Sequence, residues 1–394
     1  MNKAVLAAAF VALAATAAWA TDPGVTELEN NGWFRYQMET KKFNLSSPDK
    51  SQFRLDRGYI RMKHQFNAQL AAKVTVDVLS SDGYADGAAI RLKEAYIDFG
   101  TPVRDLLLTP GLQKHYFGLI YSWDYTNPEK SLGDKEGVVA SADYGVTANG
   151  FLPSGLGEYQ LGIYNGEGYK KSLTKLNLSP ELNANLRLTP VAGIQVGASV
   201  MYNAVDNVNY ANGTTGKLSP DRKSWLLPDT GNMKRLGISP MLKLSAGPVS
   251  LLGEYLGYSY TREYGYYTAD STSGTITDST RIAKAKKYAS NGFSVVPVLT
   301  LIDRKIEING RFDMWNVTAE GSDGSMVKDT LKSHILYGAG INYHFFRREK
   351  GKPGVEMQLF WEREQATATS VAPKDVIMAQ FRFEWMKEIR PPSL

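Results

Sequence analysis

The 394-residue chain contains no cysteine and only four histidines. Without cysteine there can be no disulfide bond, thiolate metal site, haem attachment motif or thiol nucleophile. The histidines lie far apart, without the spacing of metal ligands, and no nucleophile elbow, phosphate-binding loop or zinc motif is present. We therefore expect no metal ion, no cofactor and no enzymatic activity. A barrel protease or lipase that assembles its catalytic residues from separate strands would leave no such signal and stays an alternative.

Long apolar runs are also missing after the first twenty residues. The longest nearly continuous one, 293–302, falls far short of the roughly twenty residues that a membrane-spanning helix needs. Charge is nearly balanced, with 45 basic and 40 acidic residues and a formal net charge of +5. So slight an excess predicts no strong attraction to nucleic acid or to a membrane surface.

Residues 1–20 have the pattern of a secretory signal peptide. Lys3 supplies the positive charge, 4–17 is apolar, and the Ala-Trp-Ala at 18–20 fits the cleavage pattern of small residues. A membrane helix is the alternative, but the run is short and has no stop-transfer flank. The mature chain should begin at Thr21, with a periplasmic lead-in over 21–31.

What the chain does have is alternation. In 69–78 every second residue is apolar, and the residues between them are mostly polar and carry both signs of charge. A period of two indicates a strand whose two faces meet different solvents. A single strand of this kind fits a soluble sheet as well as the wall of a membrane barrel.

About sixteen such strands follow one another over 32–387, each of roughly nine to thirteen residues, the length that a tilted strand needs to cross a bilayer. Short and long connections alternate along the chain; 204–233 and 262–288 should be long loops, and a β-bulge or a loop end is expected near Arg57. Outer-membrane barrels alternate in this way because short turns lie in the periplasm and long loops outside the cell, whereas a soluble β-sandwich has no reason to do so. The sequence predicts an all-β fold, a transmembrane antiparallel up-and-down β-barrel with about 16 strands, 14 to 18 within boundary error, and a tail over 388–394.

A barrel of this size predicts a channel, since its lumen is too wide to be filled by wall side chains and should hold water. The charged residues expected to line the pore are Arg57, Arg61, Lys63, Lys73, Asp77, Glu94, Asp98, Arg187, Arg235, Lys243, Glu307, Arg311, Asp313 and Arg382. The simpler interpretation is that they are the water-facing half of an amphipathic wall, paired across strands for stability. Whether Lys73 and Asp77 steer ions or neutralise each other stays open. The mixture of signs argues against extreme selectivity.

The third long connection, 113–135, is rich in aromatic residues and is therefore poorly suited to free solvent. It should fold back into the lumen as a constriction, or pack on a neighbouring subunit or on the rim of the loops. The candidate constriction residues are Lys114, His115, Tyr121, Trp123, Asp124 and Lys130.

Several stretches resemble the phosphate-selective porin O/P family of bacterial outer-membrane channels. They are 53–63 with the Lys-Val-Thr-Val-Asp strand that follows, 92–99 (Leu-Lys-Glu-Ala-Tyr-Ile-Asp-Phe), 144–146 with Gly150, 163–168, 309–313 and 340–343. The resemblance spans nearly the whole mature chain and implies a sixteen-stranded, commonly trimeric outer-membrane channel for anions or small hydrophilic solutes.

The resemblance also implies a ladder of lumenal arginines with lysines on an inward loop. Arg57, Arg61 and Arg311 could occupy such positions. Acidic residues are interleaved with them, namely Glu94, Asp98 and Asp313, so the chain departs from the pattern of a phosphate-specific pore.

The first functional hypothesis is therefore a porin for passive diffusion of small hydrophilic solutes or ions, with a weak preference for anions, phosphate among them. The alternative is a structural barrel that sheaths a secreted multihaem cytochrome for electron transfer across the outer membrane, with all haem supplied by the partner. The expected partners are small solutes or anions, outer-membrane lipid and further copies of the chain in a homotrimer, with no nucleic acid.

Overall fold

The computed structural model describes residues 24–80, 87–118, 130–166, 168–169, 180–204, 217–218, 224–226, 232–269, 279–302, 305–321, 324–347 and 353–389. Sixteen antiparallel strands form the wall. They are β1 (Val25–Lys41), β2 (Lys50–Asn67), β3 (Leu70–Ser80), β4 (Ala88–Gly100), β5 (Leu106–Lys114), β6 (Ala142–Leu152), β7 (Gly157–Tyr164), β8 (Glu181–Val191), β9 (Ile194–Ala204), β12 (Asn232–Ala246), β13 (Val249–Ala269), β14 (Ser279–Leu301), β15 (Ile306–Glu320), β17 (His334–Phe346), β18 (Gly354–Ala366) and β19 (Lys374–Ile389).

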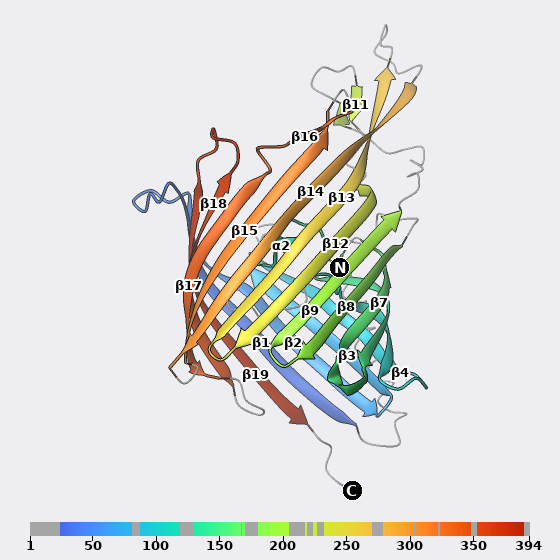
Figure 1. The fold of residues 1–394 in the computed structure, drawn as a ribbon, viewed down its shortest axis with the longest axis vertical. Coiled ribbons are helices and arrows are strands. Elements are labelled where there is room, and N and C mark those ends of the chain that lie inside the picture. Colours follow the sequence, from blue (N-terminus) through green and yellow to red (C-terminus); the bar gives the residue numbers. More distant parts are fainter. Residues whose placement is uncertain are drawn as a thin grey trace.

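The sheet closes because β1 pairs with both β2 and β19. Figure 1 shows the resulting tilted barrel. Three short strands, β10 (Lys217–Leu218), β11 (Ser224–Leu226) and β16 (Met326–Lys328), extend the long-loop end, and the described helical segments are α2 (Leu132–Lys135) and the single turn η1 (Pro153–Gly155). The predicted closed all-β barrel is confirmed. In the part of the chain that the structure describes, no helix is long and apolar enough to cross a membrane.

The wall has its apolar residues on the outside and its polar residues on the inside. On β8, Leu182 and Leu186 are 50% and 43% exposed, whereas Asn185 and Arg187 between and beside them are buried. The same pattern recurs around the barrel, leaving exposed the side chains of Phe34, Ile60, Val146, Ile163, Ile238, Ile308, Ile341 and Phe381. An apolar exterior on a closed ladder suits hydrocarbon, where every backbone donor and acceptor must be paired within the protein.

On β3 the two rows sort as the alternation predicts. Val76 pairs with Ile60 and Val78 with Ile90, and both isoleucines are exposed on the outer face. Thr75, on the other row, is completely buried and donates a hydrogen bond to Glu94 of β4 over 2.7 Å. The valine row therefore faces lipid, and the charged row faces the interior.

Both predicted ends of the barrel need correction. The expected lead-in 21–31 is wrong from Val25 onward, because β1 begins there and pairs with β2 and β19. Both rows are largely polar here, with Glu27 and Glu29 in one and Thr26 and Asn30 in the other, which hides the strand from a pattern search. At the other end β19 continues to Ile389, past the predicted boundary at 387. The predicted signal peptide 1–20 and residues 390–394 lie outside the described residues.

The predicted loop 262–288 is also wrong in large part. Strands β13 and β14 continue to Ala269 and back from Ser279 in unbroken antiparallel register, and they reach well beyond their neighbours (Figure 1). Residues 262–269 and 279–287 contain no continuous apolar row, so alternation gave no sign of these strand ends. The bulge expected near Arg57 is confirmed, since the β1–β2 register shifts there and leaves Asp56 without a partner in the ladder.

Placing a charge on the outer row should destabilise the barrel. Leu186 lies at the centre of β8 and faces outward, so Leu186→Arg should lower the free energy of unfolding in lipid vesicles by about 2–4 kcal/mol. Denaturant titration of vesicle-folded protein measures the change. Leu156→Arg, at the exposed turn after η1, is the control and should cost much less. Equal costs at the two positions would contradict the assignment of the outer face.

A constricted path through the barrel

A segment of the chain enters the barrel interior after β5. Gly118 donates its backbone N–H to Ser199 Oγ on β9 over 2.9 Å. Its φ is +56°, and a Cβ at this position would meet the side chains of Glu254 and Ser239. Only glycine combines this left-handed conformation with such close approach to the wall. The chain therefore descends against the inner wall of β9, β12 and β13.

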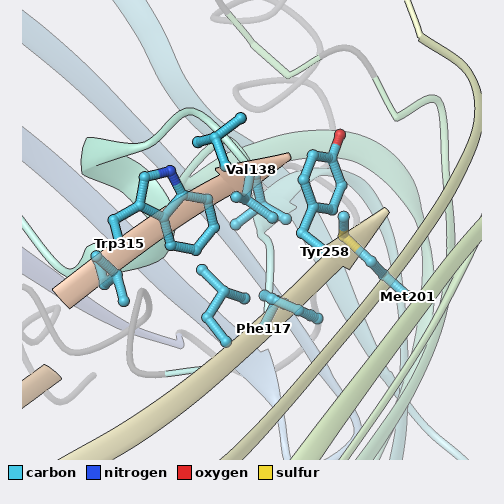
Figure 2. Packing of buried hydrophobic residues seen from close by; sticks show 9 residues of the cluster. Phe117, Val138, Met201, Tyr258 and Trp315 are labelled. Atoms are coloured by element: carbon cyan, nitrogen blue, oxygen red, sulfur yellow. The ribbon is translucent and has the colours of Figure 1, made fainter. Parts of the chain in front are cut away.

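The returning part of this segment, 130–141, packs on an apolar patch of the inner wall. Figure 2 shows the cluster, in which side chains of the segment meet side chains of β9, β13 and β15. Its members are Phe117, Leu132, Val138 and Val139 from the segment and Met201, Leu256, Tyr258, Trp315 and Val317 from the wall. All are buried, and burying an apolar side chain of this size stabilises by about 1.5–3 kcal/mol. We call 115–118 and 130–141 the inward segment.

Ion pairs connect the inward segment to the wall at β17 and β18. Lys135 Nζ lies 3.1 Å from a carboxylate oxygen of Glu364 and 3.8 Å from one of Glu362, both on β18. Glu136 Oε1 lies 3.2 Å from His334 Nε2 at the start of β17. At its end, Ser141 accepts a hydrogen bond from Lys93 of β4. The segment thus has contacts on β4, β13, β15, β17 and β18, well separated around the barrel.

These contacts place the described part of the third long connection inside the barrel. The inward stretch also runs further than 113–135, because the chain rejoins the wall only at Ala142, where β6 begins. Lys114 is the last residue of β5, and its carbonyl accepts a hydrogen bond from the Tyr164 hydroxyl over 3.0 Å. His115 is buried and its Nε2 contacts Glu181. Lys130 is half-buried, and the candidates Tyr121, Trp123 and Asp124 lie outside the described residues.

The interior of β1 and β2 is rich in arginine. Asp56 Oδ2 lies 3.1 Å from Arg35 Nη2, and Asp56 Oδ1 lies 2.8 Å from Arg54 Nη2. Arg57, the residue after Asp56, has its Nε 3.9 Å from a carboxylate oxygen of Asp77 on β3. One carboxylate thus serves two guanidinium groups, and the bulge at Asp56 is what brings them together.

Lys73 and Asp77, whose roles stayed open, do not neutralise each other. Lys73 Nζ lies 2.8 Å from Glu94 Oε2, while Asp77 has Arg57 as its neighbour. Arg61 on β2 pairs with Glu29 of β1 over 3.1 Å. Most charges on this wall have a cross-strand partner, as the simpler interpretation of an amphipathic wall expects.

The remaining predicted pore-lining residues are spread over the other strands. The paired ones are Asp98 with Thr109 (2.6 Å), Arg187 with Glu158, Arg235 with Glu181 (3.0 Å), Arg311 with Asp313 (2.6 Å), Glu307 with Arg347 (3.0 Å), and Arg382 with Glu384 and Glu356. Lys63 is half-buried and Lys243 is exposed near the short-turn end of β12. Around this wall too, most cations face a carboxylate.

Sequence reasoning missed Lys93. The alternation of β4 puts position 93 in the outward apolar row with Ala95, Ile97 and Phe99. In the structure the β3–β4 register shifts at this point, so that Thr75 pairs with Glu94 and Val76 with Leu92. Lys93 is the extra residue of a bulge, and its side chain is 6% exposed and lies against the inward segment. No residue pattern in the sequence marks this bulge.

Two tyrosines outside the strands also border the interior. Burial raises the pKa of Tyr116 and that of Tyr169 to about 12. Both phenols are therefore neutral at physiological pH. Tyr116 lies 5.9 Å from the Arg187 guanidinium and Tyr169 lies 4.0 Å from Lys93 Nζ, each ring facing a cation. Among the described residues, no group of three or more His, Asp or Glu side chains could hold a metal ion.

Removing an anchor of the inward segment should loosen it. Leu132 is completely buried in the cluster, so Leu132→Ala should lower the local stability of residues 130–141 by about 2–5 kcal/mol. Hydrogen exchange at Lys135 and Val138, whose amides donate to Ser131 and Gly133, measures the change. Leu156→Ala at the exposed turn serves as the control. Unchanged protection in Leu132→Ala would mean that the cluster does not hold the segment.

The sequence matches no protein-family model and no curated protein, but several solved structures share its fold. Outer-membrane expressed OmpT of Vibrio cholerae aligns with a TM-score of 0.58 and 11% identity over 93% of this chain and 99% of that one. A loop L8 deletion mutant of the same OmpT aligns with a TM-score of 0.57 and 12% identity, over 92% of this chain and 100% of that one. Salmonella typhi OmpF in complex with daunomycin aligns with a TM-score of 0.55 and 13% identity, over 91% of this chain and 98% of that one. The chain therefore has the fold of outer-membrane β-barrels, and its apolar exterior places it in a bacterial outer membrane.

Proposed function

We propose that the protein is an outer-membrane porin through which small hydrophilic solutes or ions diffuse passively. The observation that carries the proposal is the inward segment, which crosses a closed barrel lined with polar side chains. A polar wall offers water and ions a path, and a segment held across it narrows that path to a selective size. The contacts of 130–141 with β4, β13, β15, β17 and β18 supply such a constriction.

The charges beside this constriction favour a weak preference for anions. Asp56 is shared by Arg35 and Arg54, so positive charge is in excess there, whereas most other lumenal cations have a carboxylate of their own. A local excess in a narrow, low-dielectric site raises the concentration of the opposite ion. Phosphate is one anion that the proposal includes, on the strength of the sequence resemblance to porin O/P.

The inward segment argues against the alternative of a barrel that sheaths a multihaem cytochrome. Such a sheath would need a lumen clear of its own chain. We extend the proposal to a homotrimer, the form in which in-vitro folded OmpT of Vibrio cholerae is described. Native mass spectrometry in detergent would give the mass of three chains; a monomer in every detergent would contradict the trimer.

Planar-bilayer recording tests the proposed function. Purified protein should give discrete conductance steps, and in a KCl gradient the reversal potential should show a weak preference for chloride. Replacing chloride by phosphate should keep a measurable current. A folded protein that gives no steps would contradict the porin, and a preference for potassium would contradict the anion selectivity.

Neutralising Asp56 should strengthen the anion preference, because two arginines then share no carboxylate. The anion-to-cation permeability ratio of Asp56→Asn should rise by roughly tenfold, because removing one unit charge at about 6 Å in water favours anions about threefold and disfavours cations about threefold. Reversal potentials in a KCl gradient measure the ratio. Asp105→Asn, in an exposed turn beside Arg104, is the matched control and should leave it unchanged. A shift of Asp56→Asn toward cations would refute the role of this cluster.

A further inference from the structure

The bulge in β4 brings one lysine into the barrel that a regular strand would point into lipid. Glu94 pairs with Thr75 and Leu92 with Val76, so Lys93 has no partner residue in the β3–β4 ladder. Outward neighbours on the same strand are Ile97 and Ile90, 37% and 63% exposed, whereas Lys93 is 6% exposed. A bulge costs ladder hydrogen bonds and is typically found where a side chain has to be re-aimed.

The contacts of Lys93 differ from those of the other basic side chains on this wall. Its Nζ donates a hydrogen bond to Ser141 Oγ at the end of the inward segment. The same nitrogen lies 4.0 Å from the ring centre of Tyr169. Both partners are neutral, and no ion pair joins Lys93 to a carboxylate of the described residues.

Five neighbouring cations have carboxylates close by. Their shortest nitrogen-to-oxygen distances are 3.1 Å for Arg35, 2.8 Å for Arg54, 3.9 Å for Arg57, 3.1 Å for Arg61 and 2.8 Å for Lys73. The charged groups that act on Lys93 at longer range are Arg57, Asp134, Glu94 and Asp77. Of the three carboxylates, Glu94 is held by Lys73 and Asp77 faces Arg57, which leaves Asp134 of α2, on the inward segment.

We propose that Lys93 is a specificity-determining residue of the channel, a cation that adds to the constriction's preference for anions. It lies at the seam between the β4 wall and the inward segment. At mildly acidic pH a protonated lysine without an ion-pair partner, beside a narrow, low-dielectric passage, acts on ions without touching them, because field lines are focused into the water. Asp134, from the opposite side of that seam, acts in the other direction. This inference rests on the proposed porin function.

The test is the reversal potential in a KCl gradient at mildly acidic pH for wild type, Lys93→Met and Lys93→Arg. Lys93→Met removes the charge at similar length and should lower the anion-to-cation permeability ratio by roughly tenfold, because one unit charge at about 6 Å in water changes the anion and the cation term about threefold each, in opposite directions. Lys93→Arg keeps the charge and should keep the wild-type ratio. Asp134→Asn should raise the ratio by a similar factor.

Two controls separate the charge of Lys93 from its structural role and from net charge. Ser141→Ala removes the hydroxyl partner and keeps the lysine, so the shift in its ratio should be much smaller than that of Lys93→Met. Arg104→Gln removes an exposed cation at a turn, 94% exposed, and should also leave the ratio unchanged. Heat-modifiable migration on gels shows that each variant is folded.

The outcomes are distinguishable. Wild-type protein without conductance would refute the porin function itself. Wild type with an anion preference that Lys93→Met leaves intact would refute the role of Lys93 alone. A shift in Ser141→Ala as large as that in Lys93→Met would show that the hydrogen bond, and not the charge, sets the preference, and would equally overturn the inference.

Discussion

The closed hydrogen-bonded ladder is the constraint on which the rest of the structure depends. In hydrocarbon no backbone group can bond to water, so sixteen strands must pair around a ring in which β1 meets β19. Once the ring is closed, the period of two puts every strand's rows on opposite faces. Lipid selects Leu182, Leu186 and their counterparts for the outside, and the polar rows are left to line a lumen.

The interior departs from this rule at the apolar patch on β9, β13 and β15, and there the chain folds in upon itself. Met201, Leu256 and Trp315 put apolar surface on the inner wall, where a water-filled barrel would carry polar residues. The inward segment covers that surface with Phe117 and Leu132. Hydrophobic burial thus holds the segment across the lumen, and the ion pairs of Lys135 and Glu136 orient its far side. The path through the barrel is therefore narrowed by the packing of the inward segment on the inner wall.

Sequence reasoning reached the barrel, its strand number and the faces of strands such as β3, because lipid imposes a regular pattern. It failed where that pattern does not apply. The start of β1 at Val25 and the far ends of β13 and β14 contain no continuous apolar row and so lack the alternation that marks a strand. Lys93 was missed because a bulge changes which residues of β4 face inward, and no residue pattern in the sequence marks that bulge. Predicting the Lys73–Glu94 ion pair would have required the register between β3 and β4, which alternation within one strand does not reveal.

The central claim is that the inward segment borders the path that ions take. The absence of cysteine from the chain allows a direct measurement. A single Ala140→Cys, in the half-buried return of the segment, is treated with a charged, membrane-impermeant thiol reagent during bilayer recording. The account predicts an abrupt fall in single-channel conductance, with no fall for Thr101→Cys in the turn after β4. Full labelling of Ala140→Cys with an unchanged conductance would contradict it.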